Sequence, residues 1–420
     1  MRDWDPKRET AFFDLFADCR NLEREAMRRA GQGVFTLDRM PLLAALAGHP
    51  EQRLKLIHVA GTKGKGSTSF FLGALLEAAG ETAAVYTSPH LASVRERFWL
   101  RGAPVTYAAL EAAASGLRNA IDAKGLQPTL FEVMTVLGLR LAADAGCRWC
   151  VLETGIGGRL DATNFIPPPA CCVITPVSLD HMPLLGHTAA EIAAEKAGIL
   201  KPGVPLVLAS QPFPDAEAVI RATAARLRCP VTDNSTISEV DAGHWPDSRR
   251  WPAFLRENFR TALAVCNVLK IKPDPARFRA PALSARFELL RDEPPILLDA
   301  AHNADSARRL AEALRETWPD RPFTVVLGIV QGKDAAGIFR ELRTVAGEFI
   351  LTHPRNADRG SELETLQALA AAAGVPHRVI PDIQAAADLP AGRPLLFTGS
   401  FFTALIGEDL FGPPPTKTDT

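Results

Sequence analysis

The chain has 420 residues, of which 47% are hydrophobic and 23% charged, with a formal net charge of −1. This length accommodates two domains, and the composition is that of a soluble globular protein with a core of ordinary size. A nearly neutral chain has no global basic field, so we expect neither nucleic acid nor a membrane surface as a partner. The charged start MRDWDPKRET lacks the apolar run of a signal peptide, and no uninterrupted apolar stretch of about 18 residues predicts a transmembrane helix.

Seven cysteines are scattered along the chain, an odd number that fits reduced thiols in a cytoplasm better than a disulfide framework. Cys147 and Cys150 form a C-x-x-C pair. Neither the helix start of a redox motif nor a second pair at zinc-finger spacing accompanies it. We therefore expect Cys150 to lie in the buried strand CVLETG and predict a cytoplasmic protein.

Apolar runs alternate with helical patterns through the first part of the chain. Near-continuous apolar strands that alternate with helices predict a mostly parallel sheet covered by helices on both faces. Strands are predicted at 54–60, 83–86, 149–153, 171–175 and 205–210, and helices at 69–80, 129–146 and 191–199.

A proline-rich, charged segment at 270–288 interrupts this pattern and is interpreted as a linker. Beyond it, a second alternation predicts a smaller Rossmann-like α/β domain, so we expect one domain over 1–275 and another over 276–420. The tail at 412–420 is expected to be disordered. The strands of the second domain are predicted at 295–300, 323–330, 349–354 and 394–400, and its helices at 305–317, 334–345 and 361–373.

The glycine-rich stretch GTKGKGS follows the first predicted strand and precedes the first helix, which is the context of a phosphate-binding loop. Glycines let backbone N–H groups turn toward an anion, and the start of a helix adds partial positive charge. Lys65 is placed to reach the β- and γ-phosphates of a nucleotide. The strict Walker pattern is broken, because Val59 replaces its first glycine and Gly66 separates Lys65 from Ser67. The alternative is an ordinary glycine turn with solvated lysines.

This loop and several further stretches resemble the folylpolyglutamate synthase/dihydrofolate synthase family of the Mur ligase superfamily. The resemblance spans roughly residues 35–405, with the motifs in the family's order. It implies a monomeric ligase that uses ATP and Mg2+ to add L-glutamate to folates, to dihydropteroate, or to both, through an acyl phosphate. It also implies that 1–275 binds ATP and that 276–420 is the glutamate-ligase domain. The further stretches are YTSPHLASVRERF, TLFEVMT, LETGIGGRLDATN, the block at 174–205, ARFELL and LLDAAHN.

The resemblance implies a nucleotide site and a magnesium site. Glu153 ends a predicted strand, where open α/β sheets bind ligands, and magnesium takes hard oxygen ligands. Ser88 and His181 are further implied metal ligands, whereas His90 and His187 are expected to be structural. The alternatives are a salt bridge for Glu153 and a core or surface role for His181. The implied ATP contacts are Gly61, Thr62, Lys63, Gly64, Lys65, Gly66, Ser67, Asn258, Arg286 and Asp299.

The family match at Lys196 implies a carbamate, formed with CO2, that would serve as an anionic metal ligand. A bare ammonium would repel magnesium, and carbamate formation needs a lysine whose pKa is lowered by burial or nearby charge. The alternative is a solvated helix lysine. Lys65, Lys196 and His181 are therefore the implied catalytic residues. Lys63 departs from the family, which usually has asparagine there.

Folate-side and amino-acid contacts are also implied by the resemblance. Phe131 could stack on a pterin, but TLFEVMT could equally be the start of an amphipathic core helix. Asp299 fits a ribose or hinge role, with an N-cap of the following helix as the alternative. The implied substrate residues are Thr129, Leu130, Phe131, Glu132, Leu160, Asp161, Ala162, His302 and Ser400.

Two other functions stay open on the sequence alone. One is a Mur-type ligase that acts on a different carboxylate, although the loop reads KGKGS and no dedicated nucleotide-sugar domain precedes it. The other is a P-loop nucleotide-binding protein without ligase activity, which the second domain with ARFE and DAAHN disfavours. The discriminating observation is whether ATP turnover needs both an amino acid and a folate.

Overall fold

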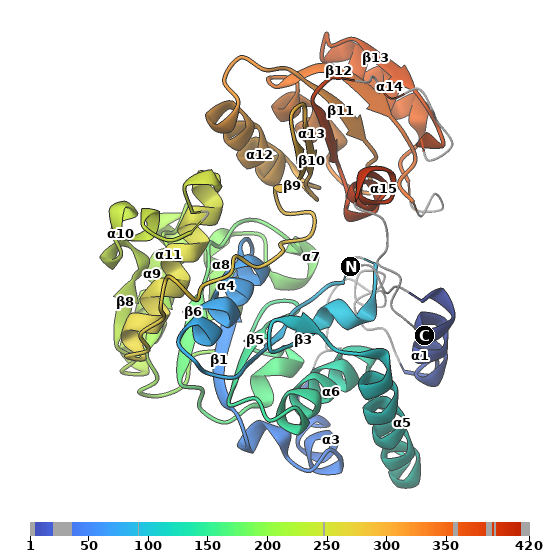
Figure 1. The fold of residues 1–420 in the computed structure, drawn as a ribbon. Coiled ribbons are helices and arrows are strands. Elements are labelled where there is room, and N and C mark those ends of the chain that lie inside the picture. The colour runs from blue at the N-terminus through green and yellow to red at the C-terminus, as the bar shows by residue number, and fades with distance from the viewer. Residues whose placement is uncertain are drawn as a thin grey trace. The chain divides into compact units, whose positions relative to one another are not determined.

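The computed structural model describes residues 5–19, 36–90, 92–246, 248–355, 360–383, 389 and 392–412. They form two compact units. The N-terminal unit lies within Trp4–Trp251 and Leu255–Pro281, and the C-terminal unit within Pro252–Phe254 and Ala282–Thr420. Each unit is a sheet flanked by helices (Figure 1), which confirms the predicted fold class of two α/β domains. The main division falls inside the segment interpreted as a linker. The predicted disordered tail lies almost wholly outside the described residues.

The N-terminal unit is built on an eight-stranded sheet in the order β4-β3-β2-β5-β1-β6-β7-β8. Its strands run parallel except for β3 and β4, which add antiparallel pairs at one edge. β1 lies between β5 and β6, and ligands of open α/β sheets bind at the carboxyl ends of such central strands. The strands are β1 (Lys55–Ala60), β2 (Ala83–Tyr86), β3 (Phe98–Leu100), β4 (Ala103–Pro104), β5 (Trp149–Glu153), β6 (Cys171–Ile174), β7 (Leu206–Leu208) and β8 (Val231–Asp233).

Helices cover both faces of this sheet, as the parallel strands require. On one face of the sheet, α3, α5 and α6 pack against one end, and α8 and α9 pack against the other end. α4 lies on the opposite face, where a Cβ on Gly73 would come within 2.6 Å of the Val85 side chain. α11 packs on α4 through the rings of Phe71 and Phe259, whose centroids lie 5.2 Å apart. The helices are α1 (Pro6–Leu15), α3 (Met40–Leu46), α4 (Lys65–Ala78), α5 (Tyr107–Lys124), α6 (Leu130–Asp144), α7 (Met182–Leu185), α8 (Ala189–Ala197), α9 (Pro214–Arg226), α10 (Glu239–Gly243) and α11 (Ala253–Val268), with short 3-10 helices η1 (Pro50–Gln52), η2 (Val94–Arg97), η3 (Ala162–Phe165), η4 (Asn234–Thr236) and η5 (Ser248–Arg250).

The C-terminal unit has a six-stranded sheet in the order β13-β12-β11-β14-β10-β9, parallel except for the antiparallel edge strand β9. Side chains of α12, α13 and α14 form one core with β11, β12 and β14. The strands are β9 (Glu288–Asp292), β10 (Pro295–Leu298), β11 (Phe323–Leu327), β12 (Ala346–Leu351), β13 (His377–Val379) and β14 (Leu395–Thr398), and the helices are α12 (Ala304–Thr317), α13 (Ala335–Leu342), α14 (Leu363–Ala372) and α15 (Phe401–Phe411).

Every strand and helix predicted from the sequence is present within a few residues of its expected position. The largest difference concerns α4, which begins at Lys65 rather than at Ser69, so the phosphate-loop lysine opens the helix. Within the part of the chain that the structure describes, no helix combines the length and apolarity needed to cross a bilayer. All seven cysteines are free thiols, as expected, and burial raises the thiol pKa of both Cys147 and Cys150. A raised pKa disfavours the reactive thiolate, which favours a structural role for the C-x-x-C pair.

Candidate active site

The glycine-rich loop joins the carboxyl end of β1 to the start of α4, and two of its glycines are required by close contacts. Gly61 has φ 149°, and a Cβ there would lie 1.9 Å from Thr175 Oγ1. Gly64 has φ 83° and caps α4, and a Cβ there would lie 2.3 Å from Asn258 Oδ1. The left-handed region and these close contacts exclude other residues. The predicted loop and Asn258 of α11 are therefore neighbours in space.

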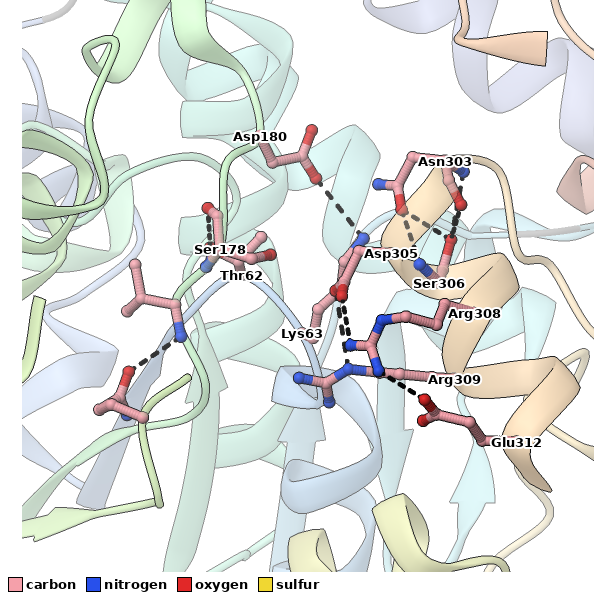
Figure 2. A network of polar contacts seen from close by, with 12 residues as sticks. Thr62, Lys63, Ser178, Asp180, Asn303, Asp305, Ser306, Arg308, Arg309 and Glu312 are labelled. Atoms are coloured by element: carbon pink, nitrogen blue, oxygen red, sulfur yellow. Dashed lines mark hydrogen bonds and ion pairs between the residues drawn. The ribbon is translucent and has the colours of Figure 1, made fainter. Parts of the chain in front are cut away.

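The segment after β6 braces this loop from the side. Pro176 O accepts hydrogen bonds from the backbone N–H groups of Thr62 and Lys63, at 3.0 and 3.1 Å. Thr62 Oγ1 donates to Ser178 O and accepts from Ser178 N, both at 3.1 Å (Figure 2). Lys63 Nζ lies 3.8 Å from Asp180 Oδ2, so the residue that departs from the family pairs with the aspartate that precedes His181.

Lys65, Glu153 and Ser88 come together at the carboxyl ends of neighbouring strands. Lys65 Nζ lies 4.0 Å from Glu153 Oε1, and the lysine side chain is only 15% exposed. Glu153 ends β5 and is 3% exposed. Its Oε2 accepts a hydrogen bond of 3.2 Å from the backbone N–H of Ser88, which follows β2. The predicted phosphate lysine and the predicted metal carboxylate thus face one another beside the start of α4.

This donor set fits magnesium. Among the described residues no cluster of three or more His, Cys, Asp or Glu side chains could hold a metal by itself. Magnesium, however, usually takes only one or two carboxylates from the protein and completes its octahedron with phosphate oxygens and waters. The buried carboxylate of Glu153, beside the loop and the Ser88 segment, suits that arrangement. The Glu153, Ser88 and His181 ligand assignments stay predictions.

Lys196 projects from α8 to the same loop. It is 4% exposed, and its Nζ donates a hydrogen bond of 2.8 Å to Gly61 O. Burial, and secondarily the charge of Lys65, lowers the pKa of Lys196 to about 7. The alternative of a solvated helix lysine is therefore wrong. The turn formed by residues 155–158 (the GIGG turn) lies against the end of α8. It approaches so closely that a Cβ on Gly158 would lie 2.9 Å from Lys196 O.

The three histidines that the sequence singled out differ in setting. His181 has φ 49°, and its backbone N–H donates to Asp180 Oδ1 at 3.0 Å, so it lies at the start of α7 in the segment that braces the loop. His90 Nδ1 accepts a hydrogen bond of 2.8 Å from Arg97 Nε, in agreement with a structural role. His187 is exposed, and its N–H helps to cap α8 through Glu191 Oε2 at 2.6 Å.

Asp161, a predicted folate contact, organises the turn that follows Glu153. Its Oδ2 accepts hydrogen bonds from the N–H groups of Gly155 and Ile156, at 2.9 and 3.0 Å. Its Oδ1 accepts from the Thr163 hydroxyl at 2.5 Å, and that hydroxyl lies 2.8 Å from His58 Nε2 on β1. Burial raises the pKa of Asp161. This chain of contacts shows that Asp161 fixes the GIGG turn, and a direct substrate contact stays a prediction.

We expect His58 to make the folding stability of the protein sensitive to acid. Burial lowers its pKa from 6.5 to about 3, so at intermediate pH the unfolded chain binds a proton that the folded chain does not. The stabilisation that neutral His58 provides is therefore fully present above the pKa of histidine in the unfolded chain. It is lost as the pH falls toward the pKa of His58 in the folded protein. When the pH is lowered from about 7 to about 4, the wild type should lose about 3 kcal/mol more of its free energy of unfolding than His58→Gln loses.

The measurement is urea denaturation at a series of pH values. His187→Gln, which alters an exposed histidine, is the matched control and should follow the wild type. Parallel curves for His58→Gln and the wild type would contradict the assignment.

The predicted pterin-side segment opens α6. Thr129 Oγ1 caps the Glu132 N–H, and Glu132 Oε2 accepts from the Thr129 N–H at 2.7 Å. Arg39 holds the same carboxylate through Nε and Nη2, at 3.0 and 2.8 Å. Phe131 packs so closely on the GIGG turn that a Cβ on Gly155 would lie 2.5 Å from its ring. Thr129 and Glu132 thus build the helix start, while Phe131 joins it to the GIGG turn.

The remaining folate-side residues differ in exposure. Leu130 is half-buried, Leu160 is 36% exposed and Ala162 is 7% exposed. Leu160 and Leu130 can therefore present apolar surface to a ligand, whereas Ala162 belongs to the core of the N-terminal unit. Sequence reasoning missed Arg39, His58 and Thr163, because their partners Glu132 and, for His58 and Thr163, one another lie far away along the chain and leave no local signal.

In the C-terminal unit, Asp299 organises the ARFE loop. Its Oδ2 accepts from the Phe287 N–H and its Oδ1 from the Ala301 N–H, both at 2.9 Å. Ala285 and Phe287 have φ values of 50° and 53°, so Arg286 is flanked by two left-handed residues. Such strained backbone is typical of functional loops. The alternative role of Asp299 as an N-cap is wrong, because Asn303 caps α12 through Ser306 (Figure 2).

His302 and Ser400, the predicted amino-acid contacts, also belong to this unit. His302 Nδ1 lies 2.9 Å from Ala300 O, and its ring centroid is 6.1 Å from that of Phe401. Ser400 is 2% exposed and caps α15 through the Thr403 N–H. The Ser400 hydroxyl is therefore engaged in building the helix start, and its contact with an amino acid stays a prediction.

A glycine loop, two lysines and a buried carboxylate thus meet at the carboxyl end of a parallel sheet, which is the arrangement of a nucleotide-phosphate site. Residues 285–401 match the family model described as the Mur ligase glutamate ligase domain. The chain is 33% identical to dihydrofolate synthase/folylpolyglutamate synthase of Bacillus subtilis, over 74% of this chain and 79% of that protein. It is 29% identical to dihydrofolate synthetase of Saccharomyces cerevisiae, over 89% of this chain and 96% of that one.

Solved structures agree with these relatives. Mycobacterium tuberculosis folylpolyglutamate synthase complexed with ADP and AMPPCP has a TM-score of 0.79 and 28% identity, covering 96% of this chain and 100% of that chain. Escherichia coli FolC in complex with DHPP and ADP has a TM-score of 0.77 and 27% identity, covering 90% and 92%. The chain belongs to the folylpolyglutamate synthase/dihydrofolate synthase family.

Proposed function

We propose that this enzyme joins L-glutamate to the carboxylate of a folate-type substrate, either a folate, dihydropteroate, or both. The observation that carries the proposal is that two lysines meet at one glycine loop. Lys65 follows the loop at the start of α4 and faces Glu153, and Lys196 reaches Gly61 O of the loop from α8. Relatives named dihydrofolate synthase and folylpolyglutamate synthase, and a FolC structure holding DHPP and ADP, support the substrate class. We further propose that the protein acts as a cytoplasmic monomer.

The reaction needs activation of the substrate carboxylate, because an ionised carboxylate is a poor electrophile. The carboxylate attacks the γ-phosphate of ATP, which gives an acyl phosphate and ADP. The amine of glutamate then attacks the acyl carbon, loses a proton and expels inorganic phosphate. One oxygen of the original carboxylate leaves with that phosphate.

The residues of this chain act mainly by positioning and charge, as phosphoryl transfer requires. The N–H groups at the start of α4 would donate to the phosphates of ATP, and Lys65 would neutralise the β- and γ-phosphates. Bound magnesium would neutralise further phosphate charge, with Glu153 and Ser88 holding it. Asp161 keeps the turn after Glu153 in place.

Phosphate release should depend on both glutamate and a folate-type acceptor. The assay tests dihydropteroate, tetrahydrofolate and UDP-linked acceptors, each with and without glutamate, and analyses the products. Amide products from both folate-type acceptors would indicate a bifunctional enzyme, and from one acceptor a monofunctional enzyme. Turnover only with a UDP-linked acceptor, or without any amino acid, would contradict the proposal.

Isotope transfer tests the intermediate. When the acceptor carboxylate carries labelled oxygen, one labelled atom should appear in the released phosphate. Retention of all the label in the amide product would exclude the acyl phosphate. Mass spectrometry of the phosphate gives the answer directly.

A further inference from the structure

Glu9 is a buried carboxylate that the reaction described above does not use. It lies on α1 and is 8% exposed. Three donors from other elements converge on it: Ser93 Oγ at 2.5 Å, the Val94 N–H at 3.0 Å and the Tyr107 hydroxyl at 2.6 Å. A carboxylate accepts in all three places, whereas the NH2 group of a glutamine would oppose a donor. The site is therefore built for a carboxylate.

Ser93 and Val94 belong to the connection between β2 and β3 that also carries Ser88. The two ends of this connection are joined where the Thr87 N–H donates to Arg97 O at 3.1 Å. Within it, Glu96 Oε1 accepts from the N–H groups of Ala92 and Ser93, both at 2.8 Å. The part of the connection held by Glu9 is thus internally hydrogen-bonded. The Thr87–Arg97 hydrogen bond lies one residue from Ser88, whose N–H meets Glu153.

The anchor of Glu9 is itself rigid. Two guanidinium groups contact the Tyr107 ring at the start of α5: Arg8 Cζ lies 4.8 Å and Arg95 Cζ 4.6 Å from the ring centroid. The Asp5 N–H donates to the Tyr107 hydroxyl at 3.1 Å, and Arg95 Nε donates to Val105 O at 2.5 Å. Cation–π contacts and buried hydrogen bonds fix α1, α5 and the connection as one body.

We propose that Glu9 is a positioning residue for the magnesium–nucleotide site. It holds Ser93 and Val94, keeps the connection after β2 in place, and so presents Ser88 to Glu153 without touching the ligand. The inference rests on the proposed function in taking Ser88 and Glu153 as metal ligands. Residues that orient metal ligands from outside commonly change metal affinity by 10- to 100-fold.

The test is calorimetric titration of ADP into the full-length protein at a series of magnesium concentrations. Glu9→Gln should raise the magnesium concentration for half-maximal ADP binding by about tenfold. Ser93→Ala, which removes one of the three donors to Glu9, should also raise this magnesium concentration, but by a smaller factor. Glu111→Gln is the matched control, because it weakens the half-exposed Arg8–Glu111 pair between α1 and α5 but removes no hydrogen bond to Glu9 or within the connection. It should match the wild type.

The readout separates this inference from the proposed function. Magnesium-linked ADP binding can be measured even if no folate-type acceptor is turned over. An unchanged magnesium dependence in folded Glu9→Gln, or a shift equal to that of Glu111→Gln, would overturn the positioning role. If Glu9→Gln fails to fold, Ser93→Ala decides, and wild-type magnesium dependence in that variant would overturn the role as well.

Discussion

Lys65→Ala is expected to lower the turnover of the ligase by two to three orders of magnitude while the protein still folds. The lysine opens α4, its side chain is 15% exposed, and its Nζ faces Glu153 at 4.0 Å. A preorganised donor of this kind contributes about 3–4 kcal/mol to the transition state, and each 1.4 kcal/mol is about tenfold in rate. The effect should fall mainly on kcat, because charge on the transferred phosphoryl group develops in the transition state.

Steady-state phosphate release measures this effect. Lys124→Ala is the control, because Lys124 is an exposed lysine at the end of α5. Lys65→Arg should recover only part of the activity, since a planar guanidinium does not reproduce the compact ammonium. Near-normal kcat in a folded Lys65→Ala variant would contradict the role of the loop lysine.

Much of the fold could be predicted because its strands are short apolar runs bounded by clear breaks. The strands Ala83–Tyr86 and Trp149–Glu153 have the predicted bounds. The sequence predicts the start of α4 too late, at Ser69, because glycines usually indicate a loop. In the structure the left-handed Gly64 acts as the cap that lets the helix begin at Lys65.

Several elements were not predicted. α5 carried recognisable signals, since Thr106 caps its start and Gly125 ends it in the left-handed region. β8 and β13 could not be recognised, because each is a half-buried strand of three residues and depends on its neighbours. Their pairing is tertiary information that a local pattern lacks.

The active site was predictable only where its residues lie inside recognisable motifs. Glu153 ends a predicted strand and Lys65 lies in the glycine-rich stretch after another predicted strand, and the structure brings the two side chains together. The chain from His58 through Thr163 to Asp161 could not be predicted, because His58 and Thr163 are separated by 105 positions. Which buried hydroxyl reaches which ring is decided by packing, and the apolar run around His58 gives no sign of it.

Lys196→Ala is expected to be nearly inactive while still folding, because we propose that Lys196 acts as a carbamate. The buried amine, whose pKa is lowered to about 7, is substantially neutral at physiological pH and can attack CO2. The reaction forms the N–C bond and releases one proton. The carbamate nitrogen keeps one N–H, so the hydrogen bond from Lys196 to Gly61 O can persist. The new oxygens are the hard anionic ligands that magnesium prefers.

Three measurements test the carbamate together. A short carboxylic acid such as acetate should restore part of the activity of Lys196→Ala, and CO2-depleted buffer should lower wild-type activity until bicarbonate is added. Lys201→Ala is the matched control: burial also lowers the pKa of Lys201, but its Nζ contacts Asn164 Oδ1 at 2.9 Å instead of the loop. That variant should stay active, gain nothing from acetate, and depend on CO2 as the wild type does. A crystal of the active enzyme with nucleotide and magnesium should show carbamate density on Lys196. An unmodified ammonium at Lys196, together with activity that does not depend on CO2, would rule the carbamate out. An unmodified lysine would then suffice for catalysis.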